Sequence, residues 1–166
     1  MLTAHEIFGF MSPALALEIL DTIHASQREI YRAALTTVAE ARKVRVVFLE
    51  RKTRVEQHKD ILASICKPNL EVLALNLLQA WLLKSQTTML TEFLDALGIK
   101  HDKGMVDGLP DSVPDEKLNA AVESLLAKNP PEKVGVYLRA FNDLNDTNWP
   151  NLTVLLDNDA RLQLGA

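Results

Sequence analysis

The chain has 166 residues, with 48% hydrophobic, 24% charged and 5% aromatic side chains and a formal net charge of −4 at pH 7. A chain of this length fits one domain that can bury about two-thirds of its unfolded surface, and a composition rich in leucine and alanine favours helix over sheet. The single cysteine, Cys66, excludes an intrachain disulfide, and we expect it to be a small buried side chain rather than a nucleophile.

The sequence predicts neither an export signal nor a membrane span. The first residues lack a basic run, and Ser12, Pro13 and Glu18 interrupt the apolar stretch 7–20. The most hydrophobic segment, 70–83, is shorter than the ~20 residues that cross a bilayer. We therefore expect a soluble, cytoplasmic protein without a membrane partner.

Residues 14–67 contain no glycine and no proline, the two residues that most readily interrupt a helix. Ahead of this segment, the capping box of Thr3 and Glu6 predicts a short first helix. Ser12, followed by proline at the first helical position, predicts the start of a second helix that should run at least to Ala41. Side chains spaced three and four apart predict one continuous helical face: Leu20, Ile23, Gln27, Ile30, Ala34, Thr37, Ala41, Val44, Phe48, Arg51, Val55, His58, Leu62 and Ile65.

The stretch 42–54 admits two interpretations. Its valines could alternate along a short strand at 43–49, but the helical face stays in phase across it, so we expect helix. A second capping box, Thr53 with Glu56, predicts a fresh helix there. One straight helix over 14–67 would be ~80 Å long, far beyond the ~15 Å radius of gyration of such a domain. We therefore expect a break or sharp bend at 42–54.

Cap and turn signals predict shorter helices in the second half. These helices cover 68–83, 86–97, 112–128, 129–144 and a short segment from Trp149. Gly98 should end the second of them, before a loop at 99–111. Residues 81–97 align without gaps onto 125–141, which predicts two similar helical hairpins. We predict an all-α, single-domain bundle of about six to eight helices over 1–166, with two long helices in 1–67 and the hairpins in 68–166.

Motifs for catalysis or for a cofactor are missing. No histidine spacing matches a zinc site, no glycine-rich loop matches a phosphate site, and the calcium-like run 143–148 has neither the central glycine nor the final glutamate of a calcium loop. We therefore predict no cofactor and no metal, and we expect a protein that is not an enzyme. One weak candidate for acid–base chemistry is His101 beside Asp102, on the predicted loop.

Charge supplies the main functional indication. Residues 41–60 contain seven basic and three acidic side chains, a net of +4, whereas residues 1–40 carry −3 and residues 61–166 carry −5. The basic side chains are the candidate contact residues: Arg42, Lys43, Arg45, Arg51, Lys52, Arg54 and Lys59. Such a patch can bind phosphates, or it can face an acidic surface of the fold or of a second subunit.

The sequence is compatible with three functions. The leading hypothesis is a non-catalytic module for protein–protein interaction or oligomerisation, with a homodimer or another protein as partner. The alternative is a nucleic-acid-associated protein that uses the basic segment 42–59. A second alternative is a small-molecule site or an enzyme site near the loop 99–111.

Overall fold

The computed structural model describes residues 2–144 and 148–164, and within these ranges the chain is all-α, with no strand. Contacts divide the chain into an N-terminal unit, Leu2–Trp81, and a C-terminal unit that begins at Leu82. The prediction of a single domain over 1–166 stays a prediction. No single helix in the described ranges is long and apolar enough to cross a membrane, although two helices joined by a 105° bend reach that length and hydropathy together.

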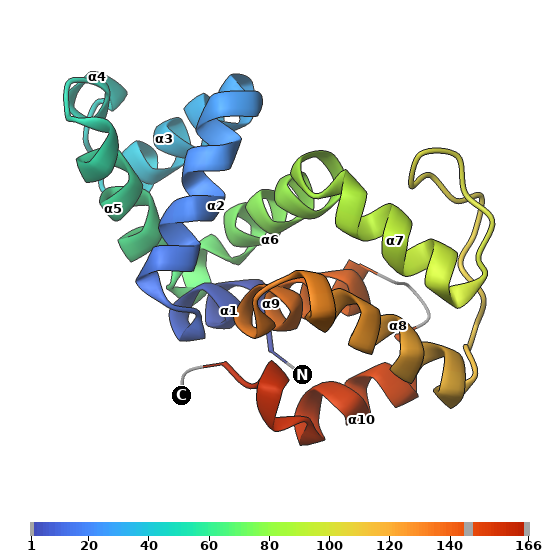
Figure 1. The fold of residues 1–166 in the computed structure, drawn as a ribbon. Coiled ribbons are helices and arrows are strands. Elements are labelled where there is room, and N and C mark those ends of the chain that lie inside the picture. The colour runs from blue at the N-terminus through green and yellow to red at the C-terminus, as the bar shows by residue number, and fades with distance from the viewer. Residues whose placement is uncertain (1, 145–147, 165–166) are drawn as a thin grey trace. The chain divides into compact units, whose positions relative to one another are not determined.

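The N-terminal unit contains six α-helices and a short 3₁₀ turn (Figure 1). Their bounds are α1 Ala4–Phe10, α2 Pro13–Ser26, α3 Arg28–Ala41, α4 Val46–Glu50, α5 Arg54–Ile65, η1 Pro68–Leu70 and α6 Glu71–Ala80. Helix α1 packs on α6, and α2, α3 and α5 pack on one another. The largest fully buried side chains of this unit are the following: Ile7, Phe8, Ile19, Leu20, Ile23, Ile61, Ile65, Leu77 and Trp81.

Three predicted helix starts are confirmed by their cap contacts. The N–H of Thr3 donates to Glu6 Oε2 at 2.8 Å, and the N–H of Leu15 donates to Ser12 Oγ at 3.2 Å. At the third start, the N–H of Thr53 donates to the Glu56 carboxylate at 3.1 Å. These side chains satisfy amides that a helix start leaves without a partner.

The predicted continuous helix from Pro13 to Ala41 is wrong. Gln27 leaves the helical region, with φ −141° and ψ 62°, and separates α2 from α3. Its side-chain amide donates to the Ala80 carbonyl at 3.2 Å, so a contact with α6 accompanies the break. The break allows α3 to pack against α2, which one straight helix would prevent.

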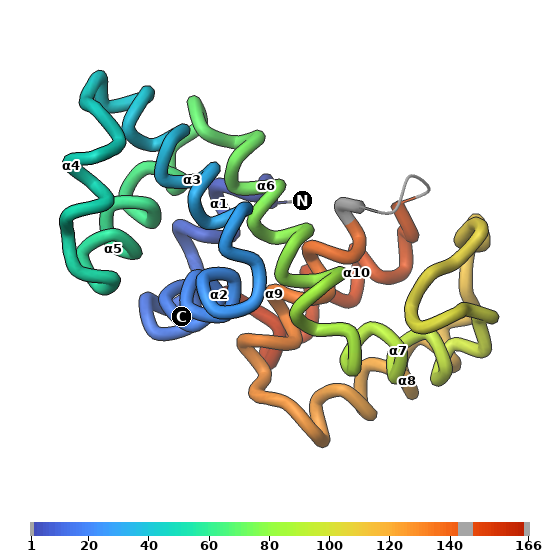
Figure 2. Tube along the Cα trace, turned by 90° about the horizontal axis from the view of Figure 1, so that it is seen from above, coloured from blue at the N-terminus to red at the C-terminus, as the bar shows by residue number. Residues whose placement is uncertain are grey.

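The bend expected at 42–54 is present, but the strand considered for 43–49 is wrong. Lys43 has a left-handed backbone with φ 57°, and the five-residue helix α4 follows. Since this residue resets the helical phase, Val44 and Phe48 do not continue the buried face and are exposed. In Figures 1 and 2, α4 lies where α3 and α5 meet, at an outer end of the unit.

The C-terminal unit contains four α-helices in its described residues. After the π-helical turn η2 (Trp81–Ser85), they are α7 Thr87–Leu97, α8 Asp115–Lys128, α9 Pro131–Leu144 and α10 Pro150–Asn158, followed by the 3₁₀ turn η3, Ala160–Leu162. Gly98 ends α7 with φ 74°, as predicted. Helices α7 and α8 pack together, and α9 packs on α8, α10 and η3.

Aromatic contacts fill the core of the C-terminal unit. The rings of Phe93 and Phe141 meet edge to face at 5.1 Å, and Phe141 lies 5.4 Å from the ring of Trp149. Trp149 is fully buried, and its indole N–H donates to the Pro110 carbonyl at 2.8 Å. This bond ties the loop between α7 and α8 to the start of α10.

Candidate functional site

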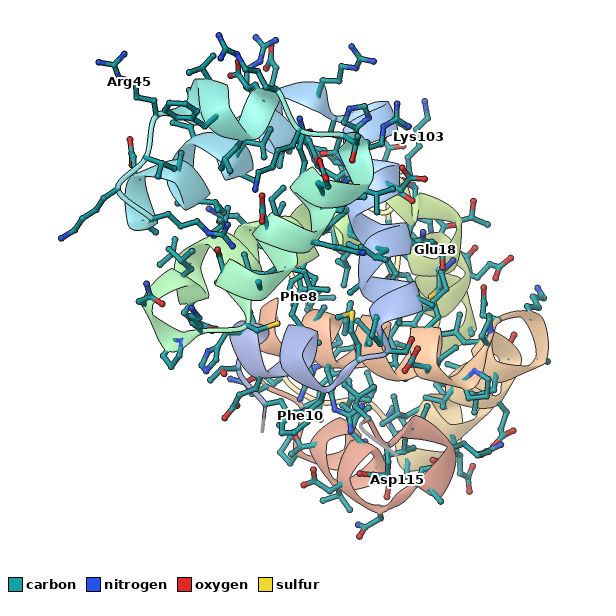
Figure 3. The ribbon with its side chains drawn as sticks, turned by 90° about the vertical axis from the view of Figure 1, so that its left-hand side faces the viewer. Phe8, Phe10, Glu18, Arg45, Lys103 and Asp115 are labelled. Atoms are coloured by element: carbon teal, nitrogen blue, oxygen red, sulfur yellow. The ribbon has the colours of Figure 1, made fainter. Side chains whose placement is uncertain are left out.

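Six of the seven predicted basic residues lie in one segment, from the end of α3 to Arg54, the first residue of α5. We call residues 42–54 the basic tip; Lys59, the seventh, lies on α5 and is exposed. Arg45 points away from the ribbon at this end of the unit in Figure 3. The structure therefore brings the predicted patch together on one protruding segment.

Backbone and side-chain contacts hold the basic tip in place. Leu49 is the only buried residue of α4, and it anchors that helix. The Gln57 side-chain amide donates to the carbonyls of Leu49, Glu50 and Lys52 at 3.1–3.2 Å. This residue carries no sequence signal of its own, and sequence reasoning missed its role.

Carboxylates of the same unit neutralise part of the patch. Asp60 accepts from Arg42 at 3.0 Å and from Lys52 at 2.7 Å. Burial raises the pKa of Asp60, but the bonds from Lys52 and Arg42 outweigh this effect and leave the pKa lowered. Arg54 lies 3.7 Å from Asp21. These three predicted cations therefore have partners inside the fold.

The other four predicted cations, Lys43, Arg45, Arg51 and Lys59, face solvent and form no ion pair within the described ranges. Three apolar side chains lie among them: Val44 is 43% exposed, Val47 37% and Phe48 57%. Solvent-facing turns usually carry polar residues, and an apolar cluster with a charged rim is typical of an interaction surface. The basic tip is therefore amphipathic as well as positively charged.

The residues of the predicted pair His101 and Asp102 have different partners in the structure. The carboxylate that His101 contacts is Asp95, at 2.7 Å from Nε2, while Nδ1 accepts from the N–H of Gly104 at 3.0 Å. Asp102 instead pairs its backbone with that of Met105, at 2.9 Å in both directions. Both ring nitrogens of His101 thus contact groups of the loop and of α7, and the carboxylate beside the ring is Asp95 rather than the predicted Asp102.

A polar cluster that sequence reasoning did not assemble lies beside α2 and α5. Nδ1 of His58 lies 2.7 Å from the hydroxyl of Tyr31, and Nε2 lies 3.4 Å from Asp21. Burial lowers the pKa of His58 and raises the pKa of Tyr31 to about 12. Both groups are therefore neutral near pH 7, and with both ring nitrogens engaged the cluster serves packing.

A hollow of about 330 Å³ borders this cluster, lined by Ala14, Leu17, Glu18, Asp21, Arg54, Val55 and His58. Three of its polar side chains already contact one another, because Arg54 and His58 both approach Asp21, at 3.7 and 3.4 Å. We therefore place no ligand in it.

A larger groove of about 620 Å³ lies on the C-terminal unit between α8 and α10. Its apolar lining includes the buried residues Leu118 and Val122 and the 57% exposed Val154. Its charged lining consists of Asp115, Glu123, Asp159 and Arg161.

Arg161 bridges two carboxylates of this groove. Its guanidinium donates to Glu123 at 2.5 Å and to Asp159 at 2.8 Å, and these bonds lower the pKa of both carboxyl groups. With three carboxylates and one guanidinium, the lining carries a net charge of −2. Because the groove joins residues far apart in the chain, no local motif could have indicated it.

No cluster of three metal-ligating side chains occurs in the part of the chain that the structure describes. Residues 145–147 of the calcium-like run 143–148 lie outside the described residues. Cys66 is half-buried rather than fully buried, and this burial raises the pKa of its thiol. Comparison with protein-family models, with curated proteins and with solved structures finds no match to this chain.

Proposed function

We propose that the chain is a non-catalytic protein-interaction module that docks on an acidic surface of a protein partner through the basic tip. The observation that carries this proposal is the exposure of Phe48, Val44 and Val47 among cations that have no carboxylate partner among the residues that the structure describes. Apolar side chains supply binding free energy on desolvation, and the surrounding charges supply orientation and rate.

The magnitudes favour a docking role over a purely electrostatic one. Complete burial of a phenylalanine or valine side chain contributes about 1.5–3 kcal/mol, and these three are about half exposed, so their burial would contribute roughly 2–4 kcal/mol together. An exposed ion pair contributes only about 0.2–1 kcal/mol. The apolar members of the basic tip therefore dominate the expected affinity.

Binding to nucleic acid is the second candidate. The unpaired cations could contact phosphates, and Phe48 could stack on an unpaired base. The two valines favour the protein partner, because aliphatic side chains do not stack on bases and make no hydrogen bond to a phosphate.

The proposal is tested by measuring the affinity of the full chain for defined probes. These are an acidic peptide that contains leucine and phenylalanine, a polyglutamate peptide of equal charge, and a single-stranded and a duplex DNA of ~20 nucleotides. We expect the apolar acidic peptide to bind about tenfold more tightly than polyglutamate. Tightest binding by either DNA would favour the second candidate and contradict the first.

Variants assign the binding to the basic tip. Phe48→Ser should weaken the apolar peptide about tenfold with little effect on polyglutamate, and the double variant Arg45→Glu with Arg51→Glu should weaken both. The matched control reverses two exposed lysines of the C-terminal unit, Lys100 and Lys117, and should change affinity by less than about twofold. Equal losses in the control and in the basic-tip variants would refute the proposal.

A further inference from the structure

The two units differ in charge. Residues 1–81 contain ten basic and nine acidic side chains, a net of +1, while residues 82–166 contain eight basic and thirteen acidic side chains, a net of −5. The positive charge of the first unit concentrates on the basic tip. Four cations on or beside this segment form no ion pair with any residue in the described part of the chain. The same chain thus offers a positive surface and a negative one.

The groove between α8 and α10 has the complementary properties of the basic tip. It is apolar at its base, with Leu118 and Val122, and a net charge of −2 surrounds this base. Its volume of about 620 Å³ lies within the range of ~300–1,000 Å³ that is typical of ligand-binding pockets. The groove therefore has room for several apolar side chains. Val154, 57% exposed at its edge, has apolar surface left to bury.

We infer that the partner of the basic tip is the α8–α10 groove of a second copy of this chain, an inference that rests on the function proposed above. Phe48 and its neighbouring valines enter the groove and cover Val154. Arg45 and Arg51 meet the carboxylates of Asp115 and Glu123. The contact therefore joins two unlike surfaces, the basic tip of one copy and the groove of the next.

Arg161 limits the negative charge of the groove in the isolated chain. It already bonds to Glu123 and Asp159, so an arriving arginine shares these carboxylates with it. A carboxylate has about four acceptor positions and can accept from two guanidinium groups at once. Removing Arg161 should therefore strengthen the contact, a gain that a purely structural residue would not produce.

The inference is tested by sedimentation velocity of the full chain from about 1 to 500 µM, at about 50 and 500 mM NaCl. We expect association of the unaltered chain at low salt and its loss at high salt. Arg161→Gln should tighten association several-fold. A chain that stays monomeric at low salt and the highest concentration overturns this inference, while the peptide-binding test of the proposed function keeps its own outcome.

Complementary charge reversals assign the contact to the two surfaces. Arg45→Glu with Arg51→Glu changes the basic tip, and Asn119→Lys with Glu123→Lys changes exposed groove positions. Each double variant alone should associate at least about tenfold more weakly, and their equimolar mixture should recover association, since unlike surfaces again face each other. Val154→Ser should weaken association without added charge and serves as a check against misfolding.

The failure of this inference differs from the failure of the proposed function. Suppose that the Asn119→Lys with Glu123→Lys variant and the Val154→Ser variant associate as tightly as the unaltered chain, while the basic-tip variant does not. The basic tip then docks elsewhere, and this inference is wrong. If the basic-tip variant also keeps full self-association and full binding to the acidic peptide, both proposals are wrong.

Discussion

Replacing Gly135 with alanine should destabilise the C-terminal unit, although alanine is the better helix former. Gly135 lies within α9, where the η3 turn crosses it closely. A Cβ atom at this position would lie 2.8 Å from the Leu162 carbonyl oxygen and 3.2 Å from Nη1 of Arg139. The first neighbour is backbone, so η3 must move away.

The expected loss in the free energy of unfolding follows from two contacts that η3 makes through Leu162. Leu162 is fully buried, and its carbonyl accepts from the buried Arg139 at 2.5 Å. Partial loss of a leucine's burial costs about 1–2 kcal/mol, and weakening a hydrogen bond to a charged donor costs about 1.5–3 kcal/mol. Helix propensity returns about 1 kcal/mol. The net expectation is a loss of about 1.5–4 kcal/mol, or roughly 5–15 °C in Tm.

Thermal and urea unfolding, followed by circular dichroism and tryptophan fluorescence, measure this loss. The matched control is Gly9→Ala in α1, where an added Cβ meets nothing within 4 Å and the same substitution should be neutral or stabilising. If Gly135→Ala raises Tm as Gly9→Ala does, the close crossing of η3 over α9 is wrong.

Three further predictions concern the pH dependence and the local stability of the fold. Burial lowers the pKa of His58, so the unfolded chain binds a proton at a higher pH than the folded chain does. The free energy of unfolding should therefore fall as the pH drops below about 6.5. Urea titrations at pH 5–8 should show a smaller fall for His58→Gln. Glu71 accepts from the N–H groups of Ala4 and His5 at 2.8 Å and so caps the start of α1. Glu71→Ala should therefore lower the free energy of unfolding by about 1–2 kcal/mol and increase amide exchange in α1. Unchanged exchange would contradict this capping contact. Gly98 has φ 74°, so Gly98→Ala should cost about 1 kcal/mol by urea unfolding, and no loss would contradict the left-handed end of α7.

Helix starts and ends were predictable where their signals are local. Thr3, Ser12, Thr53 and Gly98 each act within a few residues of themselves, and the structure places each as expected. The break at Gln27 had no such signal, because neither glycine nor proline marks it. What accompanies it is a bond to the Ala80 carbonyl, a tertiary contact that sequence spacing does not encode.

The candidate site was predictable in charge but not in shape. The run of basic residues located the basic tip, yet spacing placed Val44 and Phe48 on a buried face. That expectation assumed one unbroken helical phase, and the left-handed Lys43 ends that phase. The groove could not be predicted from the sequence for another reason. Glu123 and Arg161 belong to separate helical elements, and only the fold brings them together.

The rigidity of the basic tip bears on how it would bind. Five residues of helix would not persist alone, since isolated helices this short are marginal in water. Here Leu49 is buried, and the Gln57 amide donates to three carbonyl groups, those of Leu49, Glu50 and Lys52. Phe48 is therefore presented from a backbone that is already ordered, and docking need not meet the cost of ordering it. Because the free energy from burying three apolar side chains is only a few kcal/mol, this preorganisation decides whether such a small surface can bind measurably.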